Sequence, residues 1–170
     1  MITLSTATSM VVLAASLGGA IQDCNEAPDP KRQISGCSAY IASGQAEGEN
    51  LVTAYVNRAV ARAATHAYKG ALADFSAALK VDPKNWLVFY NRGSVFFDLG
   101  KDDLAIKDFA SAIEADPNTA IAYYNRGLAY ERRGDMQKAL EDYRRAVALD
   151  QSDVNAKEHL DRLTAREQNF

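Results

Sequence analysis

The chain has 170 residues, enough for one domain with a substantial buried core. Apolar residues make up 48% and charged residues 24%, which is ordinary for a soluble globular protein. The formal net charge is −3 and no strongly basic patch occurs, so composition disfavours a nucleic-acid partner.

The N-terminal stretch is uncharged and apolar. The first 22 residues carry no charged side chain, and an apolar run from Met10 to Ala20 precedes Ile21. Gly18 and Ala20 fit a small-x-small cleavage site, which predicts a secretory signal peptide over residues 1–20 and no membrane insertion after its removal. The run is shorter than the ~20 residues of a membrane span. Because the stretch lacks Lys and Arg, a cytosolic tail on a cytoplasmic protein is the alternative.

Two cysteines follow the predicted cleavage position. Cys24 and Cys37 are the only cysteines, and an exported chain with one such pair favours a structural disulfide. Closing a loop of that length is worth ~3 kcal/mol in the chain-entropy estimate. Two buried free thiols are the alternative. The spacing does not fit a CxxC motif, and His66 and His159 are far apart, so we expect no metal site and no cofactor.

The segment 21–50 is predicted to hold an N-terminal capping helix and a linker. Apolar residues recur at helical spacing within residues 29–43, namely Ile34, Cys37, Tyr40 and Ile41. The stretch SGQAEGEN at 43–50 favours a flexible connection to the part of the chain that follows.

The central part of the chain is a repeat with a period of 34 residues. The motif YNRG of the third copy aligns with YNRG in the second and with VNRA in the first. The repeat units are 52–85, 86–119 and 120–153.

Small and aromatic residues occupy the same columns in all units. The small columns are Ala59/Gly93/Gly127, Ala71/Ala105/Ala139 and Ala78/Ala112/Ala146, and the aromatic column is Phe75/Phe109/Tyr143. Two helices of a hairpin approach most closely where side chains are smallest, so these columns predict a helix-turn-helix in each unit. Helix ends are expected at Pro83 and Pro117, and chain breaks at Gly100 and Gly134. The predicted N-caps are Asn85, Thr119 and Asp153.

These columns resemble the tetratricopeptide repeat family over residues 52–153. The resemblance implies an all-α, right-handed α-solenoid of three helix-turn-helix units, closed at both ends by capping helices. The C-terminal cap is expected at 154–170, with Val154, Leu160 and Leu163 as its apolar stripe. The first unit departs from the pattern at Arg62 and His66. The N-terminal layout is similar to that of small exported bacterial repeat proteins, which implies a periplasmic or secreted location.

In that family the first helix of each unit lines a concave groove that binds peptides. Helical spacing then predicts the groove residues in this chain. They are Asn57, Tyr90, Asn91, Ser94, Phe97, Tyr124, Asn125, Leu128 and Arg132. The Asn column is suited to the backbone of an extended peptide because an amide both donates and accepts, and the tyrosines would add apolar contact. The alternative is that the Asn side chains satisfy local backbone groups and the tyrosines pack between units.

Arginine and aspartate also recur with the repeat. The columns Arg58/Arg92/Arg126 and Asp74/Asp108/Asp142 are predicted to form ion pairs within each hairpin, each worth ~0–1 kcal/mol if exposed. No lysine falls on the inner face, where Arg132 is the one basic residue. We therefore do not expect a clamp for a C-terminal carboxylate of the chaperone-docking kind.

The sequence favours a non-catalytic scaffold that binds a protein or peptide partner in the bacterial periplasm or envelope. A self-associating structural module is the alternative, with Phe170 of one copy in the groove of the next as a homo-oligomer. No GxSxG, HExxH, P-loop or dinucleotide fingerprint occurs, so we expect no enzyme activity.

Overall fold

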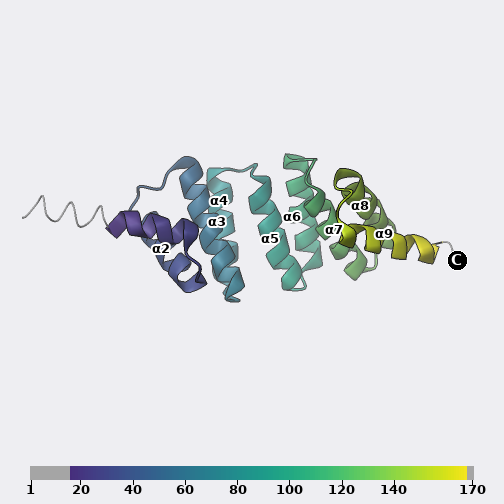
Figure 1. The fold of residues 1–170 in the computed structure, drawn as a ribbon, viewed down its shortest axis with the longest axis horizontal. Coiled ribbons are helices and arrows are strands. Elements are labelled where there is room, and N and C mark those ends of the chain that lie inside the picture. Colours follow the sequence, from purple (N-terminus) through teal and green to yellow (C-terminus); the bar gives the residue numbers. More distant parts are fainter. Residues whose placement is uncertain (1–15, 168–170) are drawn as a thin grey trace, which may run out of the picture. The chain divides into compact units, whose positions relative to one another are not determined.

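The computed structural model describes residues 16–167, and this part of the chain consists of helices joined by short turns, with no strand in it (Figure 1). The predicted all-α class is confirmed. Most of the predicted signal peptide, residues 1–15, and the C-terminal Phe170 lie outside the described residues. The chain divides into two compact units after Pro83, and each unit is described by itself.

The unit before Lys84 contains a helical segment at 16–26, α2 (Pro30–Ala42), α3 (Gly48–Ala64) and α4 (Tyr68–Val81). The unit from Lys84 onward contains α5 (Trp86–Asp98), α6 (Asp102–Ala115), α7 (Ala120–Arg133), α8 (Met136–Leu149) and α9 (Val154–Glu167). The pairs α3/α4, α5/α6 and α7/α8 pack as hairpins, and α2, α6 and α8 also contact the helix that follows them. One hairpin thus corresponds to one 34-residue repeat of the sequence.

Each hairpin closes on its small and aromatic columns. A Cβ atom added at Gly93 would lie 2.9 Å from two ring carbons of Phe109, and one added at Gly127 would lie 2.8 Å from Tyr143. Phe75, Phe109 and Tyr143 are at most 1% exposed. Burial of one such ring stabilises the fold by ~1.5–3 kcal/mol. The predicted crossing columns are therefore confirmed.

All three predicted N-cap positions are confirmed, and two of them carry a side-chain hydrogen bond. The side chain of Asn85 accepts a hydrogen bond from the Val88 amide at 3.2 Å, and that of Asp153 accepts one from the Ala156 amide at 3.1 Å. Thr119 stands at the N-cap of α7, but its side chain makes no capping hydrogen bond. Its hydroxyl is buried and has no hydrogen-bond partner within the described part of the chain.

A disulfide joins the helical segment 16–26 to α2 through Cys24 and Cys37. Both cysteines are fully buried in a small core. That core also contains Tyr40, Ala46 and Ala54, with Leu17, Ile21, Ile41 and Leu51 packed against it. The predicted cleavage position after Ala20 falls inside the helical segment, and the signal peptide itself stays a prediction.

The connection predicted at 43–50 is shorter in the structure, and its flexibility stays a prediction. Helix α3 begins at Gly48, and Ala46 is only 6% exposed because it packs into the core around the disulfide. The connection between α2 and α3 is therefore short and anchored.

Helix α9 closes the second unit. Leu163 is buried at 5% exposure and Leu160 packs beside it, whereas the outer residues of the helix are polar and exposed. Val154, predicted in the apolar stripe, is 72% exposed, because it is the first residue of α9 and lies outside the packed stripe. None of the described helices combines the length and apolar character that a membrane span requires.

Candidate functional site

The predicted groove residues of the second unit lie on the first helices of its two hairpins. We use "the α5–α7 face" for this surface. It comprises Leu87, Tyr90, Asn91, Ser94, Phe97 and Asp98 on α5 and Ile121, Tyr124, Asn125, Leu128 and Arg132 on α7. The Asn125 amide donates to the Tyr90 hydroxyl at 3.0 Å, and the Arg132 guanidinium lies 3.6 Å from the centre of the Phe97 ring. These contacts make one continuous surface across the two helices.

Asn57 belongs to the first unit and has a structural role there. Its amide nitrogen donates to the Cys24 carbonyl at 3.2 Å and to the side-chain oxygen of Asn25 at 3.3 Å. Gln33 donates to the same Cys24 carbonyl at 3.1 Å. Carbonyls in the last turn of a helix lack intrahelical partners, and Asn57 supplies one at the end of the segment 16–26. The alternative that the Asn side chain satisfies groups of the fold itself therefore describes Asn57, and its role in peptide binding stays a prediction.

Asn91 and Asn125 keep part of their hydrogen-bonding capacity. Asn91 donates to the Leu87 carbonyl of its own helix at 2.8 Å, and Asn125 donates to Tyr90 as described above. Both side chains are partly exposed. Among the described residues, neither amide oxygen accepts a hydrogen bond, and each nitrogen retains a second N–H. Both amides can therefore pair with the backbone of another chain.

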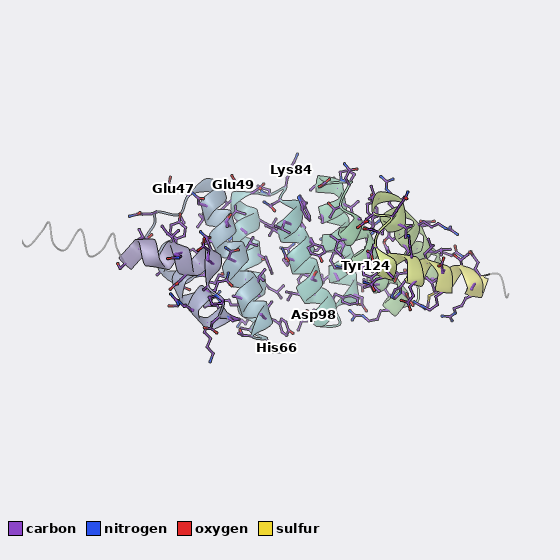
Figure 2. All side chains as sticks on the ribbon, viewed as in Figure 1. Glu47, Glu49, His66, Lys84, Asp98 and Tyr124 are labelled. Atoms are coloured by element: carbon purple, nitrogen blue, oxygen red, sulfur yellow. A yellow bond between two sulfur atoms is a disulfide. The ribbon has the colours of Figure 1, made fainter. Side chains whose placement is uncertain are left out.

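The rings of Tyr90 and Tyr124 pack against aromatic residues beneath the α5–α7 face. The Tyr90 ring lies 6.1 Å from Phe109 and 6.5 Å from Trp86. The Tyr124 ring (Figure 2) lies 5.9 Å from Tyr143 and 5.8 Å from His159. Both tyrosines are half-buried, so the packing alternative describes their rings better than direct contact with a ligand.

Two further predicted groove residues are engaged within the fold. Leu128 packs against the core cluster that contains Leu140, Tyr143 and Leu163, because α9 covers this part of α7. The Ser94 hydroxyl donates to the Tyr90 carbonyl at 3.0 Å. We therefore remove Leu128 from the candidate ligand-binding residues and leave Ser94 as a neighbour of the site.

Arg132 was predicted as the one basic residue of the face, but its charge is neutralised. Its Nε atom lies 2.7 Å from a carboxylate oxygen of Asp102, and it also donates to the Phe97 carbonyl at 2.6 Å. The guanidinium therefore holds α7 to the last turn of α5 and the first residue of α6, and is not available as a free cation.

A charged cluster on α7 and α9 was missed by sequence reasoning. Glu131 accepts hydrogen bonds from Tyr143 at 2.9 Å and Arg162 at 2.7 Å, and lies 3.3 Å from His159 Nδ1. Burial alone would raise the pKa of Glu131, but the hydrogen bonds from Arg162, Tyr143 and His159 together lower it. The available signal was the repeat period, since His159 lies 34 residues after Asn125 and continues its column.

The predicted Arg–Asp pairs are present in every hairpin. Both carboxylate oxygens of Asp74, Asp108 and Asp142 accept from one guanidinium at 2.6–3.0 Å. The carboxylates are only 5–6% exposed, so the small contribution given for exposed pairs does not apply to them. The small crossing residues let the two helices approach so closely that the carboxylate loses its water. Arg62, an outlier of the first unit, adds a second cation to Asp74 at 2.6 Å.

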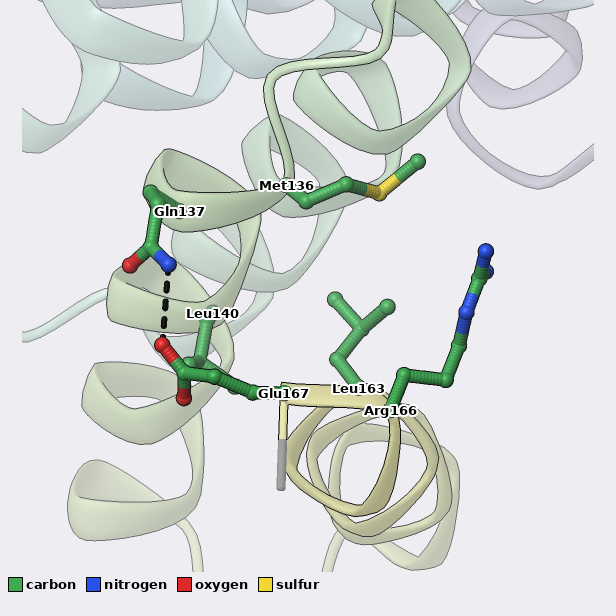
Figure 3. Close-up of a pocket in the computed structure, with 6 residues that line it drawn as sticks. All are labelled: Met136, Gln137, Leu140, Leu163, Arg166 and Glu167. Atoms are coloured by element: carbon green, nitrogen blue, oxygen red, sulfur yellow. Dashed lines mark hydrogen bonds between the residues drawn. The ribbon is translucent and has the colours of Figure 1, made fainter. Parts of the chain in front are cut away.

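A separate pocket of about 280 Å³ lies between α8 and α9 (Figure 3). It is lined by Met136, Gln137, Leu140, Leu163, Arg166 and Glu167. Gln137 donates to Glu167 across its edge at 2.8 Å. None of the predicted site residues borders this pocket. Within residues 16–167, no group of three metal-ligating side chains comes together.

Comparison with known proteins places the chain among repeat proteins. A tetratricopeptide repeat model matches residues 120–153, and a TPR repeat model matches residues 93–134. No curated protein matches the chain by sequence.

Solved structures show the same fold. MamA from Desulfovibrio magneticus RS-1 is 24% identical with a TM-score of 0.77, over 92% of this chain and 86% of that one. The first TPR of Spaghetti (RPAP3), bound to the HSP90 peptide SRMEEVD, is 22% identical with a TM-score of 0.68, over 74% of this chain and 99% of that one. The second TPR domain of human RPAP3, in complex with the HSP70 peptide SGPTIEEVD, is 22% identical with a TM-score of 0.64, over 67% and 95%.

Proposed function

The chain is a tetratricopeptide repeat protein, and on that premise we propose that it is a scaffold that binds an extended segment of a partner protein on the α5–α7 face without changing it chemically. The observation that carries this proposal is the pair Asn91 and Asn125, whose side-chain amides keep unused hydrogen-bonding groups at an exposed surface. Two structural neighbours hold peptides, which agrees with the proposal.

Apolar side chains flank the two amides. Leu87 and Ile121 occupy the same position of consecutive repeats, at the first turn of α5 and of α7, and each is 41% exposed. Such side chains gain free energy when a partner covers them, at ~25 cal/mol per Å² of apolar surface. The amides would align the partner backbone, and Leu87 and Ile121 would take up its aliphatic side chains.

We also propose that the protein works in an oxidising compartment, such as the periplasm. The fully buried disulfide between Cys24 and Cys37 supports this location, because disulfides rarely persist in the reducing cytosol. Thiol labelling of the natively produced, denatured protein tests it. We expect no labelling before reduction and two labelled cysteines afterwards, whereas labelling without reductant would contradict an oxidising location.

Peptide binding can be tested with the full chain and a random peptide display library. Peptides that are enriched on the wild-type protein are then measured by fluorescence anisotropy against the Asn91→Ala, Asn125→Ala double variant. We expect at least tenfold weaker binding, about 1.4 kcal/mol, because the partner backbone loses two hydrogen-bonding side chains.

Asn118→Ala is the matched control, since Asn118 is an exposed amide in the turn between α6 and α7. Its binding should equal that of the wild type, and circular dichroism should show unchanged helicity in all variants. Equal binding by the double variant would move the site away from the two amides, and a library without any enriched peptide would refute the proposed function.

A further inference from the structure

Asp98 is an unpaired anion at the end of the α5–α7 face. It is the last residue of α5 (Figure 2) and is exposed. Among the described residues, none forms an ion pair or a side-chain hydrogen bond with it. A negative charge in the last turn of a helix is opposed by the partial negative charge of the helix C-terminus. Asp98 therefore works against the stability of its own helix, and no contact within the described fold compensates for it.

The cations near Asp98 are already engaged. Arg132 pairs with Asp102, and Arg133 pairs with Asp103 and with Asp135. The pairs with Asp102 and Asp103 tie α7 to the first turn of α6, and both guanidiniums are engaged. Lys101 is the remaining cation of the α5–α6 turn, and Lys138 acts on Asp135. None of these cations forms an ion pair with Asp98 among the described residues. The carboxylate of Asp98, which has no ion-pair partner among the described residues, is suited to a cation from outside the chain.

The opposite end of the face is apolar. Leu87 lies eleven residues before Asp98 on the same helix, and helical spacing puts both on the same side. At ~1.5 Å of rise per residue, the two positions are about 16 Å apart along α5. An extended chain covers that distance with about five residues.

We infer that the segment bound by the α5–α7 face carries an aliphatic side chain and a basic side chain about five residues apart, with the aliphatic group against Leu87 and Ile121 and the basic group at Asp98. This inference rests on the proposed function and names the class of partner. It excludes acidic peptides such as the SRMEEVD bound by the RPAP3 neighbour, because the face has a surplus anion and no free cation among its described residues.

Designed peptides test the inference directly by fluorescence anisotropy. The probe GSLSGSAKSG carries Leu and Lys five positions apart, and its twins are GSLSGSAESG, without the base, and GSSSGSAKSG, without the aliphatic residue. We expect the wild-type chain to bind the first probe at least tenfold more tightly than either twin. Equal binding, or a preference for the acidic twin, overturns the inference.

Variants of Asp98 supply the second arm. Asp98→Asn should weaken binding of the Leu–Lys probe about tenfold. Asp98→Lys should reverse the preference, so that the acidic twin binds more tightly than the Leu–Lys probe. The melting temperature of Asp98→Asn should stay equal or rise, since the helix loses an unfavourable charge. Glu114→Gln removes an exposed carboxylate from α6 and is the matched control, with unchanged binding. A lower melting temperature together with unchanged binding would assign Asp98 to the fold and overturn its role.

The random peptide library distinguishes failure of the scaffold function from failure of the inference about the bound segment. Enriched peptides that combine aliphatic and basic residues at this spacing support both. Enriched peptides without this pair overturn the inference and leave the scaffold function standing. No enrichment, together with no binding of the three designed probes, refutes the scaffold function and the inference with it.

Discussion

Arg92 on α5 and Asp108 on α6 form a two-point ion pair, with Nε–Oδ2 and Nη2–Oδ1 distances of 2.6 and 2.7 Å. The same guanidinium lies over the Phe89 ring, 5.7 Å from its centre. Because this arrangement recurs sixteen residues apart in every hairpin, the most regular charged column of the repeat holds paired helices together and does not face a partner.

Replacing Asp108 by Asn should lower the free energy of unfolding by about 2–3 kcal/mol. The change leaves a largely buried guanidinium without its counter-charge, and a fully buried pair would cost ~3–5 kcal/mol. The lower figure applies because Arg92 keeps 21% of its side-chain surface exposed. Urea unfolding followed by circular dichroism measures the effect. Asp103→Asn is the control, because its carboxylate is 82% exposed in its pair with Arg133 and should contribute at most ~1 kcal/mol.

Replacing His66 by Gly should stabilise the first unit by about 1 kcal/mol. His66 has a φ of +59°, whereas glycine occupies the corresponding turns at Gly100 and Gly134. A side chain in this left-handed region costs ~1–2 kcal/mol, part of which the greater freedom of glycine in the unfolded chain offsets. Denaturant unfolding is the measurement. His66→Ala keeps the strain and removes the contact with Tyr68, so it should not stabilise, and equal stabilisation by both changes would contradict the explanation.

Glu131 should make the second unit sensitive to acid. Its pKa lies below the usual value of 4.5, because the hydrogen bonds from Arg162, Tyr143 and His159 together outweigh burial, which opposes the charge. The native state binds this proton less readily than the unfolded chain. The resulting stabilisation is therefore complete above about pH 4.5 and is lost as the pH falls through the lower native pKa.

Glu131→Gln should remove that part of the pH dependence. The free energy of unfolding, measured at pH values on both sides of 4.5, should depend less on pH for the variant. The variant should be less stable than the wild type, and by the largest amount near neutral pH. Glu114→Gln, at an exposed carboxylate, should follow the wild-type curve. A profile of Glu131→Gln parallel to that of the wild type would exclude this cluster as the acid-sensitive contact.

Loss of the disulfide should act on the first unit alone. Replacing Cys24 and Cys37 by Ser removes a link across thirteen residues, worth ~3 kcal/mol in the chain-entropy estimate. Hydrogen exchange should then increase over the segment 16–26 and α2, and around Asn57 in the middle of α3. Helices α5–α9 serve as the internal reference, and uniform loss of protection across both units would contradict a local effect.

The helix pairs could be predicted from the sequence because each depends on local chemistry repeated at one period. Gly93 and Gly127 mark the helix crossings, Phe109 and Tyr143 fill the space beside them, and the sixteen-residue offset pairs the arginines with the aspartates. Both partners of such a contact lie within a single repeat, so both can be recognised when the repeats are aligned with one another. The positions of the helices and the partners of the Arg column follow from it.

The sequence alone determined that the chain is a series of helical hairpins and which residues take the same position in successive hairpins. Only the tertiary structure decided which of those residues remain available. Asn57 and Asn125 occupy the same column of the repeat. The Asn57 amide donates to the Cys24 carbonyl, whereas Asn125 keeps unused hydrogen-bonding groups at the surface. The difference arises because a side chain's remaining capacity depends on the neighbours that other segments bring to it, and those neighbours lie outside the repeat period.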